Sequence, residues 1–147
     1  MTTVEEYTTV CTNRPPDCTN AAPTVDELWP PNHQFVPVGI EDISDPDGDP
    51  ITFTVTGIFQ DDPVDTYGDG SFTPDGVGVG TDSCEVRAER SGTPGVPGDG
   101  RMYHINFMAD DGAGGMCAGV VAVSVPHDQC GGAIAIDGGT LYDSTAP

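Results

Sequence analysis

Glycine and proline interrupt this chain so often that no ordinary helix fits between them. The 147 residues include 20 Gly and 14 Pro, and both residue types weaken or end helices. Val, Ile, Thr and Phe fill the stretches in between, and these residue types favour strands. A chain of this length is expected to form one domain. The sequence therefore predicts a single all-β domain.

Nine stretches have the composition of strands and are separated by turn-forming residues. They are residues 3–10, 24–28, 35–40, 51–59, 84–89, 101–109, 117–125, 133–136 and 140–142.

Three of these stretches alternate apolar and polar residues with the period of two that marks a strand buried on one face. In residues 101–109, His104 and Asn106 fall on the face opposite the core. The sets predicted to face the core are Tyr103, Ile105, Phe107 and Ala109, then Ile51, Phe53 and Val55, and then Val121, Val123 and Val125.

Strands separated by turns, without helical segments to serve as crossovers, favour an antiparallel sandwich over a parallel sheet. About seven of them lie within residues 18–128, which matches the size of an immunoglobulin-like domain. The predicted fold is an immunoglobulin-like antiparallel β-sandwich of about seven core strands with extra terminal strands. Residues 1–17 are predicted to be an N-terminal extension and residues 129–147 a C-terminal extension.

Acidic residues dominate the charge of the chain. It has 24 Asp and Glu against four Arg and no Lys, for a formal net charge of −20. Such a surplus destabilises a compact fold unless cations neutralise it. Nucleic acid and anionic lipid are therefore excluded as partners, and metal ions are favoured. An evenly solvated acidic surface is the alternative, but the acids concentrate in turns of ligand type.

The five cysteines favour disulfides over a metal site, because they include no CxxC pair and no Cys/His spacing typical of zinc. Disulfides imply an oxidising, extracellular or periplasmic compartment. The odd number leaves one thiol free or bonded to another chain. The first residues lack the features of a signal peptide, and no apolar run is long enough to span a bilayer.

The sharpest motif is the turn Asp45-Pro46-Asp47-Gly48-Asp49, which lies between two predicted strands. Acids at alternate positions of a tight turn can direct their oxygens toward one ion, and Ca²⁺ takes six to eight oxygen ligands. The following β-pattern excludes an EF-hand. A simple turn is the alternative, because Asp, Pro and Gly are also the preferred turn residues. The candidate ligands here are Asp42, Asp45, Asp47 and Asp49.

A second acidic turn should complete the coordination shell, because loops cluster at the two ends of a sandwich. Asp110 and Asp111 begin such a turn after residues 101–109. A looser group, including Asp69, Asp75 and Asp82, lies in a Gly-rich stretch between residues 59 and 84. That stretch is either ordered by metal or a solvated loop. Glu89 is either a further ligand in this group or the ion-pair partner of Arg87 or Arg90.

Residues with catalytic potential form no recognisable constellation. His33 and His127 are interpreted as structural, since zinc needs three or four converging ligands. There is no GxSxG motif and no cysteine with a local nucleophile signature. Trp29 is the only tryptophan and offers a limited platform for a sugar ring. The chain is therefore not expected to be an enzyme.

The Asp45–Asp49 motif, together with Ala109-Asp110-Asp111-Gly112-Ala113-Gly114, resembles turns of the cadherin-like and immunoglobulin-like domains of bacterial extracellular proteins. The resemblance covers about residues 18–128. It implies a calcium-binding sandwich with Asp45, Asp47, Asp49 and Asp110 as ligands. Its topology would place the first and last core strands side by side, so that Cys18 and Cys117 form a disulfide.

These features predict a secreted or cell-surface structural module stabilised by Ca²⁺. Residues 3–10 or 133–136 would join it to a neighbouring copy by adding a strand to an exposed sheet edge, giving a fibre or surface layer. Alternatively, each terminal segment folds back onto its own sheet. The alternative function is a glycan-binding or spacer domain of a larger secreted enzyme, with its functional surface around Trp29.

Overall fold

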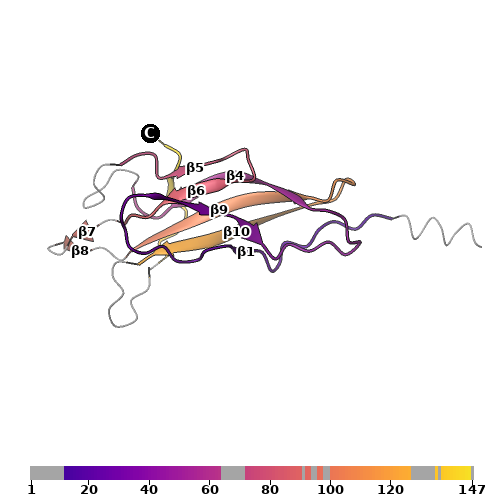
Figure 1. Cartoon of the computed structure of the whole chain (residues 1–147), viewed down its shortest axis with the longest axis horizontal. Helices are drawn as coiled ribbons and strands as arrows, with labels where there is room; N and C mark the ends of the chain where they lie inside the picture. The colour runs from indigo at the N-terminus through magenta and orange to yellow at the C-terminus, as the bar shows by residue number, and fades with distance from the viewer. Residues whose placement is uncertain are drawn as a thin grey trace, which may run out of the picture.

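The computed structural model describes residues 12–63, 72–90, 92–93, 96–97, 100–126, 135 and 137–146. Within these residues the chain forms antiparallel sheets and no helix (Figure 1), so the predicted all-β class is confirmed. No helix in this part of the chain is long and apolar enough to cross a membrane. The immunoglobulin-like strand order stays a prediction.

The larger sheet has four strands in the order β10-β9-β4-β11, all antiparallel. Its strands are β4 (Thr52–Gln60), β9 (Arg101–Asp110), β10 (Met116–Val125) and β11 (Tyr142–Asp143).

The second sheet has the order β2-β6-β5 and is also antiparallel. Its strands are β2 (Phe35–Val38), β5 (Gly76–Val77) and β6 (Cys84–Arg87). Two short pairs complete the described strands. They are β1 (Ala22–Pro23) with β3 (Ile40–Glu41), and β7 (Gly92–Thr93) with β8 (Val96–Pro97).

The core forms where the predicted alternation directs apolar side chains inward. Tyr103, Ile105, Phe107 and Ala109 of β9 are each at most 1 % exposed. The predicted set in β10 is also buried, with exposures of at most 4 %, while Ile51 and Phe53 are partly buried against the core. A β-bulge between Val55 and Gly57 shifts the alternation of β4, because one extra residue on one strand moves the following side chains to the other face. Gln60 consequently points inward and is fully buried.

The segment predicted as a strand at residues 24–28 is less regular than expected. β1 ends at Pro23, before this range, and within it Glu27 forms only an isolated parallel bridge to Ser124 of β10. The predicted strand 35–40 is divided into β2 and β3. Residues 3–10 and most of 133–136 lie outside the described residues.

The C-terminal segment folds back onto the chain's own sheets. Tyr142 and Asp143 pair with Gln60 and Phe59 of β4. Ser144 donates its backbone N–H to Ile58, and its carbonyl accepts hydrogen bonds from the N–H groups of Asp75 and Gly76 in the other sheet. This segment therefore joins the two sheets.

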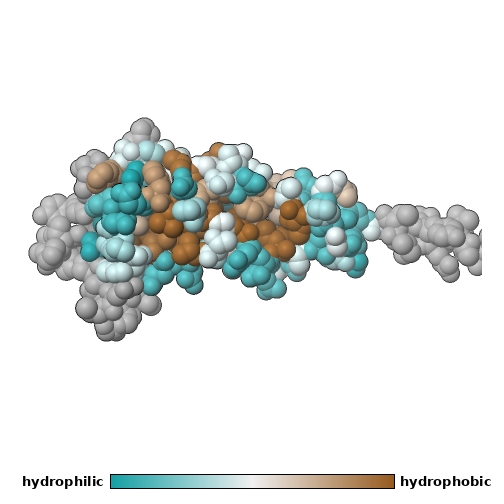
Figure 2. Space-filling model, in the orientation of Figure 1, coloured by the Kyte–Doolittle hydropathy of each residue, from teal (hydrophilic) through white to brown (hydrophobic). Residues whose placement is uncertain are grey.

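The turns that carry the acidic motifs lie at one end of the sandwich. In Figure 1 the β9–β10 hairpin lies at the end away from β7 and β8. In Figure 2, hydrophilic residues gather toward both ends of the described molecule and apolar residues lie between them. Hydrophilic residues thus gather where the strands of the sandwich end.

Candidate metal centre

Three carboxylates from two turns meet at this end of the sandwich. Asp45 and Asp49 come from the turn between β3 and β4, and Asp111 follows β9. One carboxylate oxygen of each lies within 4.8 Å of the other two. Oxygens bound to one Ca²⁺ at about 2.3 to 2.6 Å are separated by at most about 5 Å, so the spacing suits a single ion.

The Asp45 side chain organises its own turn and keeps one oxygen available. Its Oδ1 accepts hydrogen bonds from the N–H groups of Asp47 at 2.8 Å and Asp49 at 3.2 Å. Gly48 adopts φ = 77°, which L-residues rarely adopt. The Oδ2 atom is buried and has no hydrogen-bond partner among the described residues. A buried carboxylate oxygen without a donor is costly, and a cation would satisfy it.

Asp111 is held by its own loop and is only 3 % exposed. Its Oδ1 accepts hydrogen bonds from the N–H groups of Ala113 at 2.8 Å and Gly115 at 2.9 Å, and its Oδ2 accepts one from Asn13 Nδ2 at 2.9 Å. These bonds, the Asn13 contact foremost, lower the pKa of Asp111. Asp111 is therefore ionised and held in a fixed orientation, as a metal ligand would need to be.

Asp49 is in the opposite electrostatic situation. Its burial, followed by the negative charges of Asp45 and Asp111, raises its pKa. The folded state therefore resists ionisation of Asp49. A bound cation would remove that resistance.

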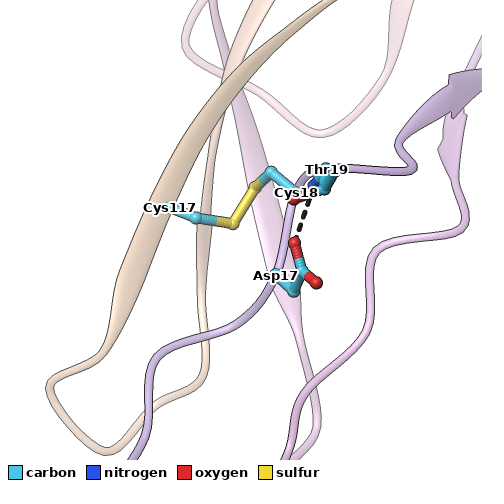
Figure 3. Close-up of a disulfide and its surroundings, with 4 residues drawn as sticks. All are labelled: Asp17, Cys18, Thr19 and Cys117. Atoms are coloured by element: carbon cyan, nitrogen blue, oxygen red, sulfur yellow. Dashed lines mark hydrogen bonds between the residues drawn. A yellow bond between two sulfur atoms is a disulfide. The ribbon is translucent and has the colours of Figure 1, made fainter.

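The N-terminal segment anchors both acidic turns. Asp17 and Ser44 form an isolated antiparallel bridge directly before Asp45. Cys18, which follows Asp17, forms a disulfide with Cys117 with a Cα–Cα distance of 5.9 Å (Figure 3). Cys117 follows the Asp111 turn closely, so one short segment holds the two turns together. The predicted Cys18–Cys117 disulfide is confirmed, and it is compatible with an oxidising compartment.

Asp47 belongs to the same turn but faces the N-terminal segment. Its carboxylate accepts hydrogen bonds from Arg14 N at 2.7 Å and Arg14 Nε at 2.8 Å. These contacts, the backbone one first, lower the pKa of Asp47. Sequence reasoning missed Arg14 and Asn13, because no local pattern shows that they reach the two turns.

The remaining predicted ligands are not part of the triad. Asp42 is exposed, with φ = 65°, and Asp82 is exposed between β5 and β6. Asp110 ends β9 and accepts a hydrogen bond from Gly112 N–H at 2.7 Å. Asp69 lies outside the described residues. Asp75 lies beside Arg101, at the opposite end of β9 from Asp110, in the polar network described next.

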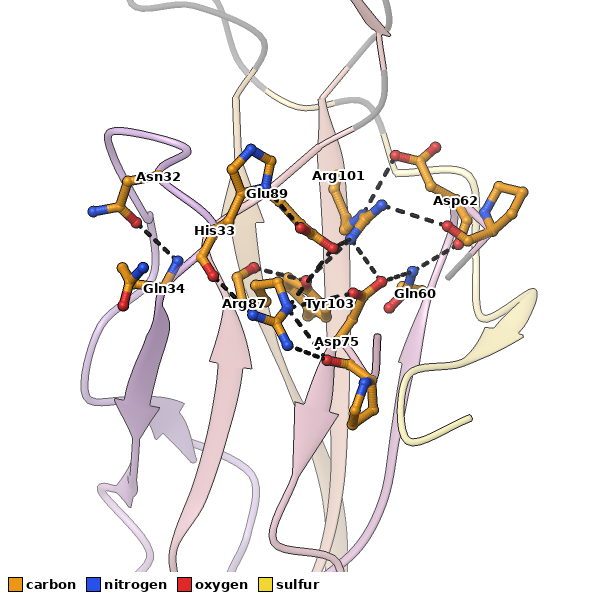
Figure 4. A network of polar contacts seen from close by, with 12 residues as sticks. Asn32, His33, Gln34, Gln60, Asp62, Asp75, Arg87, Glu89, Arg101 and Tyr103 are labelled. Carbon is orange, nitrogen blue, oxygen red and sulfur yellow. Dashed lines mark hydrogen bonds and ion pairs between the residues drawn. The ribbon is translucent and has the colours of Figure 1, made fainter. Parts of the chain in front are cut away.

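Asp75 is fully buried beside the equally buried Arg101. Its Oδ2 accepts hydrogen bonds from Arg101 Nη1 at 2.9 Å and Gln60 Nε2 at 2.8 Å (Figure 4). Burial opposes the charge of Arg101, but Tyr103 and Asp75 outweigh it and raise the pKa of Arg101. Arg101 therefore remains charged, and its contact with Asp75 gives that carboxylate a structural role.

Glu89 extends this network toward the surface. Its Oε1 lies 3.4 Å from Arg101 Nη1, and its Oε2 lies 2.9 Å from His33 Nδ1 (Figure 4). The Tyr103 hydroxyl donates to the Arg87 carbonyl at 2.7 Å. The interpretation of Glu89 as an ion-pair partner and of His33 as structural agrees with these contacts. The Arg87-Ala88-Glu89-Arg90 run predicted an ion pair of Glu89 with a neighbouring Arg, but it did not reveal Arg101 as a partner.

Cys84 is a free, buried thiol. Its Sγ donates to the Val38 carbonyl at 3.1 Å, and burial raises its pKa to about 11. A thiol with so high a pKa is poorly nucleophilic. Cys11 and Cys130 lie outside the described residues.

The arrangement at the acidic end can bind a hard cation through carboxylate oxygens. It combines three clustered carboxylates with a buried oxygen that has no donor. Among the described residues, no nucleophilic side chain and no pair of proton-transfer groups is hydrogen-bonded to these three carboxylates. Comparisons of the chain with protein-family models, curated proteins and solved structures find no match.

Proposed function

We propose that this chain is a calcium-stabilised extracellular structural module that assembles through strand addition. The observation that carries the calcium part is the buried Asp45 Oδ2, which has no hydrogen-bond donor among the described residues and lies in the triad with Asp49 and Asp111. The triad would supply three carboxylate ligands. Backbone carbonyls and water would complete the six to eight ligands that Ca²⁺ takes.

Calcium suits this site better than zinc or magnesium. The triad contains only carboxylates, whereas zinc sites use Cys and His. Magnesium demands near-ideal octahedral geometry and keeps several of its waters, while calcium accepts irregular shells. The disulfide and the acidic composition both suit an extracellular setting, where calcium is about 1 mM.

The expected stabilisation per site is modest. Extracellular modules bind Ca²⁺ with Kd values of roughly 0.1 to 1 mM, so about 1 mM Ca²⁺ stabilises each site by about 0.4 to 1.4 kcal/mol. Relief of repulsion between Asp45, Asp49 and Asp111 is part of this binding free energy. It is not an additional term.

The calcium proposal is tested by thermal melts with about 2 mM Ca²⁺ and with chelator, at fixed ionic strength. The wild-type chain should melt at a higher temperature with Ca²⁺, and Asp45→Asn should remove this difference. Asp82→Asn is the matched control, because it removes one exposed carboxylate outside the triad. A calcium response that survives Asp45→Asn would contradict the proposed site.

The assembly part rests on the outer edge of β10. This strand pairs with β9 on one side. On its other side, the described backbone hydrogen bonds are those of Ser124 with Asp26 and Leu28. Met116 and Val120 on this strand are 51 % and 56 % exposed. Between these hydrogen bonds and the Cys18–Cys117 disulfide, the described residues of β10 form no backbone hydrogen bond on this side, although β1 lies close to the strand. A strand edge with free backbone groups and exposed apolar side chains can accept an added strand.

The donor segment is proposed to be residues 3–10 of a neighbouring copy, which are β-prone and free of proline. The C-terminal segment is a weaker candidate, because residues 142–144 already bind the chain's own sheets. A head-to-tail contact that does not close into a ring would produce a filament.

Sedimentation of the full chain and of a chain lacking residues 1–11, both in Ca²⁺, tests this part. The full chain should form large species and the shortened chain should remain monomeric. A matched Val120→Lys variant should also block assembly, because charge on an edge strand opposes pairing. A full chain that stays monomeric at all concentrations would exclude assembly and leave the calcium proposal intact.

A further inference from the structure

A cavity of about 210 Å³ lies beside Trp29, between the segment before it and the second sheet. Its apolar lining includes Leu28 and Ala88, which are 3 % and 2 % exposed, and Val36 of β2. Trp29 itself is 40 % exposed and borders the cavity. The cavity therefore joins a buried apolar floor to an accessible indole.

Three polar side chains also line this cavity, namely Glu27, Asn32 and Gln34. Asn32 Oδ1 accepts a hydrogen bond from Gln34 N–H at 3.1 Å, which leaves the Asn32 amide N–H groups available. The side chains of Glu27 and Gln34 form no hydrogen bond with the residues that the structure describes. Apolar pockets with a few free, convergent polar groups are typical ligand sites.

The side chains that line the cavity indicate which class of ligand it can bind. Drug-sized pockets measure roughly 300 to 1,000 Å³, so this smaller cavity has room for about one ring. Two side-chain amides and a carboxylate offer both donors and acceptors, as neighbouring hydroxyl groups require. The face of an indole packs against the C–H groups of a saturated ring.

Charge and aromatic content disfavour anionic ligands and organic cations. The formal net charge of −20 opposes an anionic ligand. Organic cations are held by cages of several aromatic rings, whereas Trp29 is the only aromatic side chain among the described residues of the lining. We propose that this cavity binds one neutral sugar ring of a glycan, with the ring against Trp29 and its hydroxyls on Asn32, Gln34 and Glu27.

This inference is independent of the calcium site. The cavity contains Ala88 and Leu28, near the Arg101 end of β9, whereas the triad lies beyond Asp110 at the other end of that strand. Sugar binding would give an adhesive module its ligand. It should persist when Ca²⁺ is removed, provided that the chain remains folded.

The test uses the fluorescence of Trp29, which is the only tryptophan in the chain and therefore reports on this site alone. The full chain is titrated with methyl glycosides of glucose, galactose, mannose and N-acetylglucosamine, and with choline as a cationic probe. At least one neutral glycoside should give a saturable change with a Kd in roughly the millimolar range, as expected for one small ring.

Variants distinguish this site from unspecific effects. Gln34→Ala is exposed and keeps the fluorophore, and it should weaken sugar binding by roughly five-fold through loss of one hydrogen bond. Trp29→Ala should abolish binding, read by saturation-transfer difference NMR. Tyr142→Ala is its matched control, because Tyr142 is 41 % exposed on β11. Thermal melts establish that each variant is folded.

The proposal is overturned if no neutral glycoside binds saturably, or if choline binds and the glycosides do not. Unchanged sugar affinity in Gln34→Ala and Trp29→Ala would also overturn it. Repeating the titration with Asp45→Asn separates the two proposals. Loss of the calcium response with retained sugar binding supports both, whereas a missing sugar response in a calcium-responsive chain contradicts only the sugar site.

Discussion

Asp49 shows how one carboxylate can oppose folding until a cation binds. Its pKa is raised by burial and by the charges of Asp45 and Asp111, so the folded state binds a proton more tightly than the unfolded state. The stability that this proton contributes is lost as the pH rises through the pKa of the folded state. At neutral pH, Asp49 therefore lowers the stability of the calcium-free protein.

Asp49→Asn should consequently raise the melting temperature in chelator and remove most of the calcium response. The neutral side chain no longer repels the other two carboxylates, but it is a weaker ligand. Thermal melts in chelator and in Ca²⁺ measure both effects, with Asp82→Asn as the control. A lower melting temperature in chelator would show that Asp49 stabilises the turn by other contacts.

Acidification should weaken calcium binding, because protons and Ca²⁺ compete for Asp49. The raised pKa of Asp49 means that this competition starts at a higher pH than for an ordinary aspartate. Titration calorimetry between about pH 7 and about pH 4 should show a steadily rising Kd. A Kd that does not change over this range would exclude Asp49 as a ligand.

Arg101 should be far more important for stability than Arg14. Arg101→Met would remove the closest cation from the buried Asp75 and leave it with Arg87 at 3.8 Å. Losing one partner of a buried ion pair costs about 3 to 5 kcal/mol, and the remaining Arg87 contact places the expected loss toward the lower end of this range. Arg14→Met removes a surface pair with Asp47 and should cost less than about 1 kcal/mol. Urea unfolding in chelator measures both, and equal losses would contradict the structural role of the network.

At the scale of elements, the segment around Cys18 links the two turns that form the candidate metal centre. It contacts Ser44 through Asp17 and is bonded to Cys117 of β10. The pairing of Thr52 with Asp110 already brings the two turns to the same end of the sheet. The cross-link adds a second constraint on the position of Asp45 relative to Asp111.

Replacing both Cys18 and Cys117 with Ala should lower the free energy of unfolding by about 2 to 4 kcal/mol, because the disulfide closes a long loop. The calcium affinity should fall at the same time, since the carboxylates lose their fixed spacing. Urea unfolding and calorimetry measure the two effects. Lower stability with an unchanged Kd would mean that the hairpins alone position the triad.

At the scale of the whole molecule, the net charge of −20 imposes a general repulsion between carboxylates, which any dissolved cation reduces. The repulsion among the three carboxylates of the triad is specific, and only an ion bound there would remove it. Salt screens the general part, since the Debye length falls from about 30 Å at 0.01 M to about 8 Å at 0.15 M. The specific part belongs to the triad. The two contributions can be separated experimentally.

In chelator, raising NaCl from about 0.01 M to about 0.15 M should raise the melting temperature of the wild-type chain and of Asp45→Asn alike. At constant ionic strength, Ca²⁺ should then stabilise only the wild-type chain. Equal stabilisation of both proteins by Ca²⁺ would show that it acts only on the general charge.

The sequence by itself determined the features that depend on neighbouring residues. Glycine and proline exclude helices, alternation places Tyr103 and Phe107 in the core, and the spacing of Asp45 and Asp49 creates a ligand-type turn. Each of these follows from local backbone geometry. The all-β class and the position of the acidic turn were therefore predictable.

Only the tertiary structure decided which residues meet across the sandwich. It selected Asp111, and not Asp110, to meet Asp45 and Asp49. It turned Asp47 toward Arg14 and paired Asp75 with Arg101. It also opened a cavity beside Trp29. These outcomes depend on strand register, a β-bulge and a disulfide between distant segments, and no local pattern encodes such distances.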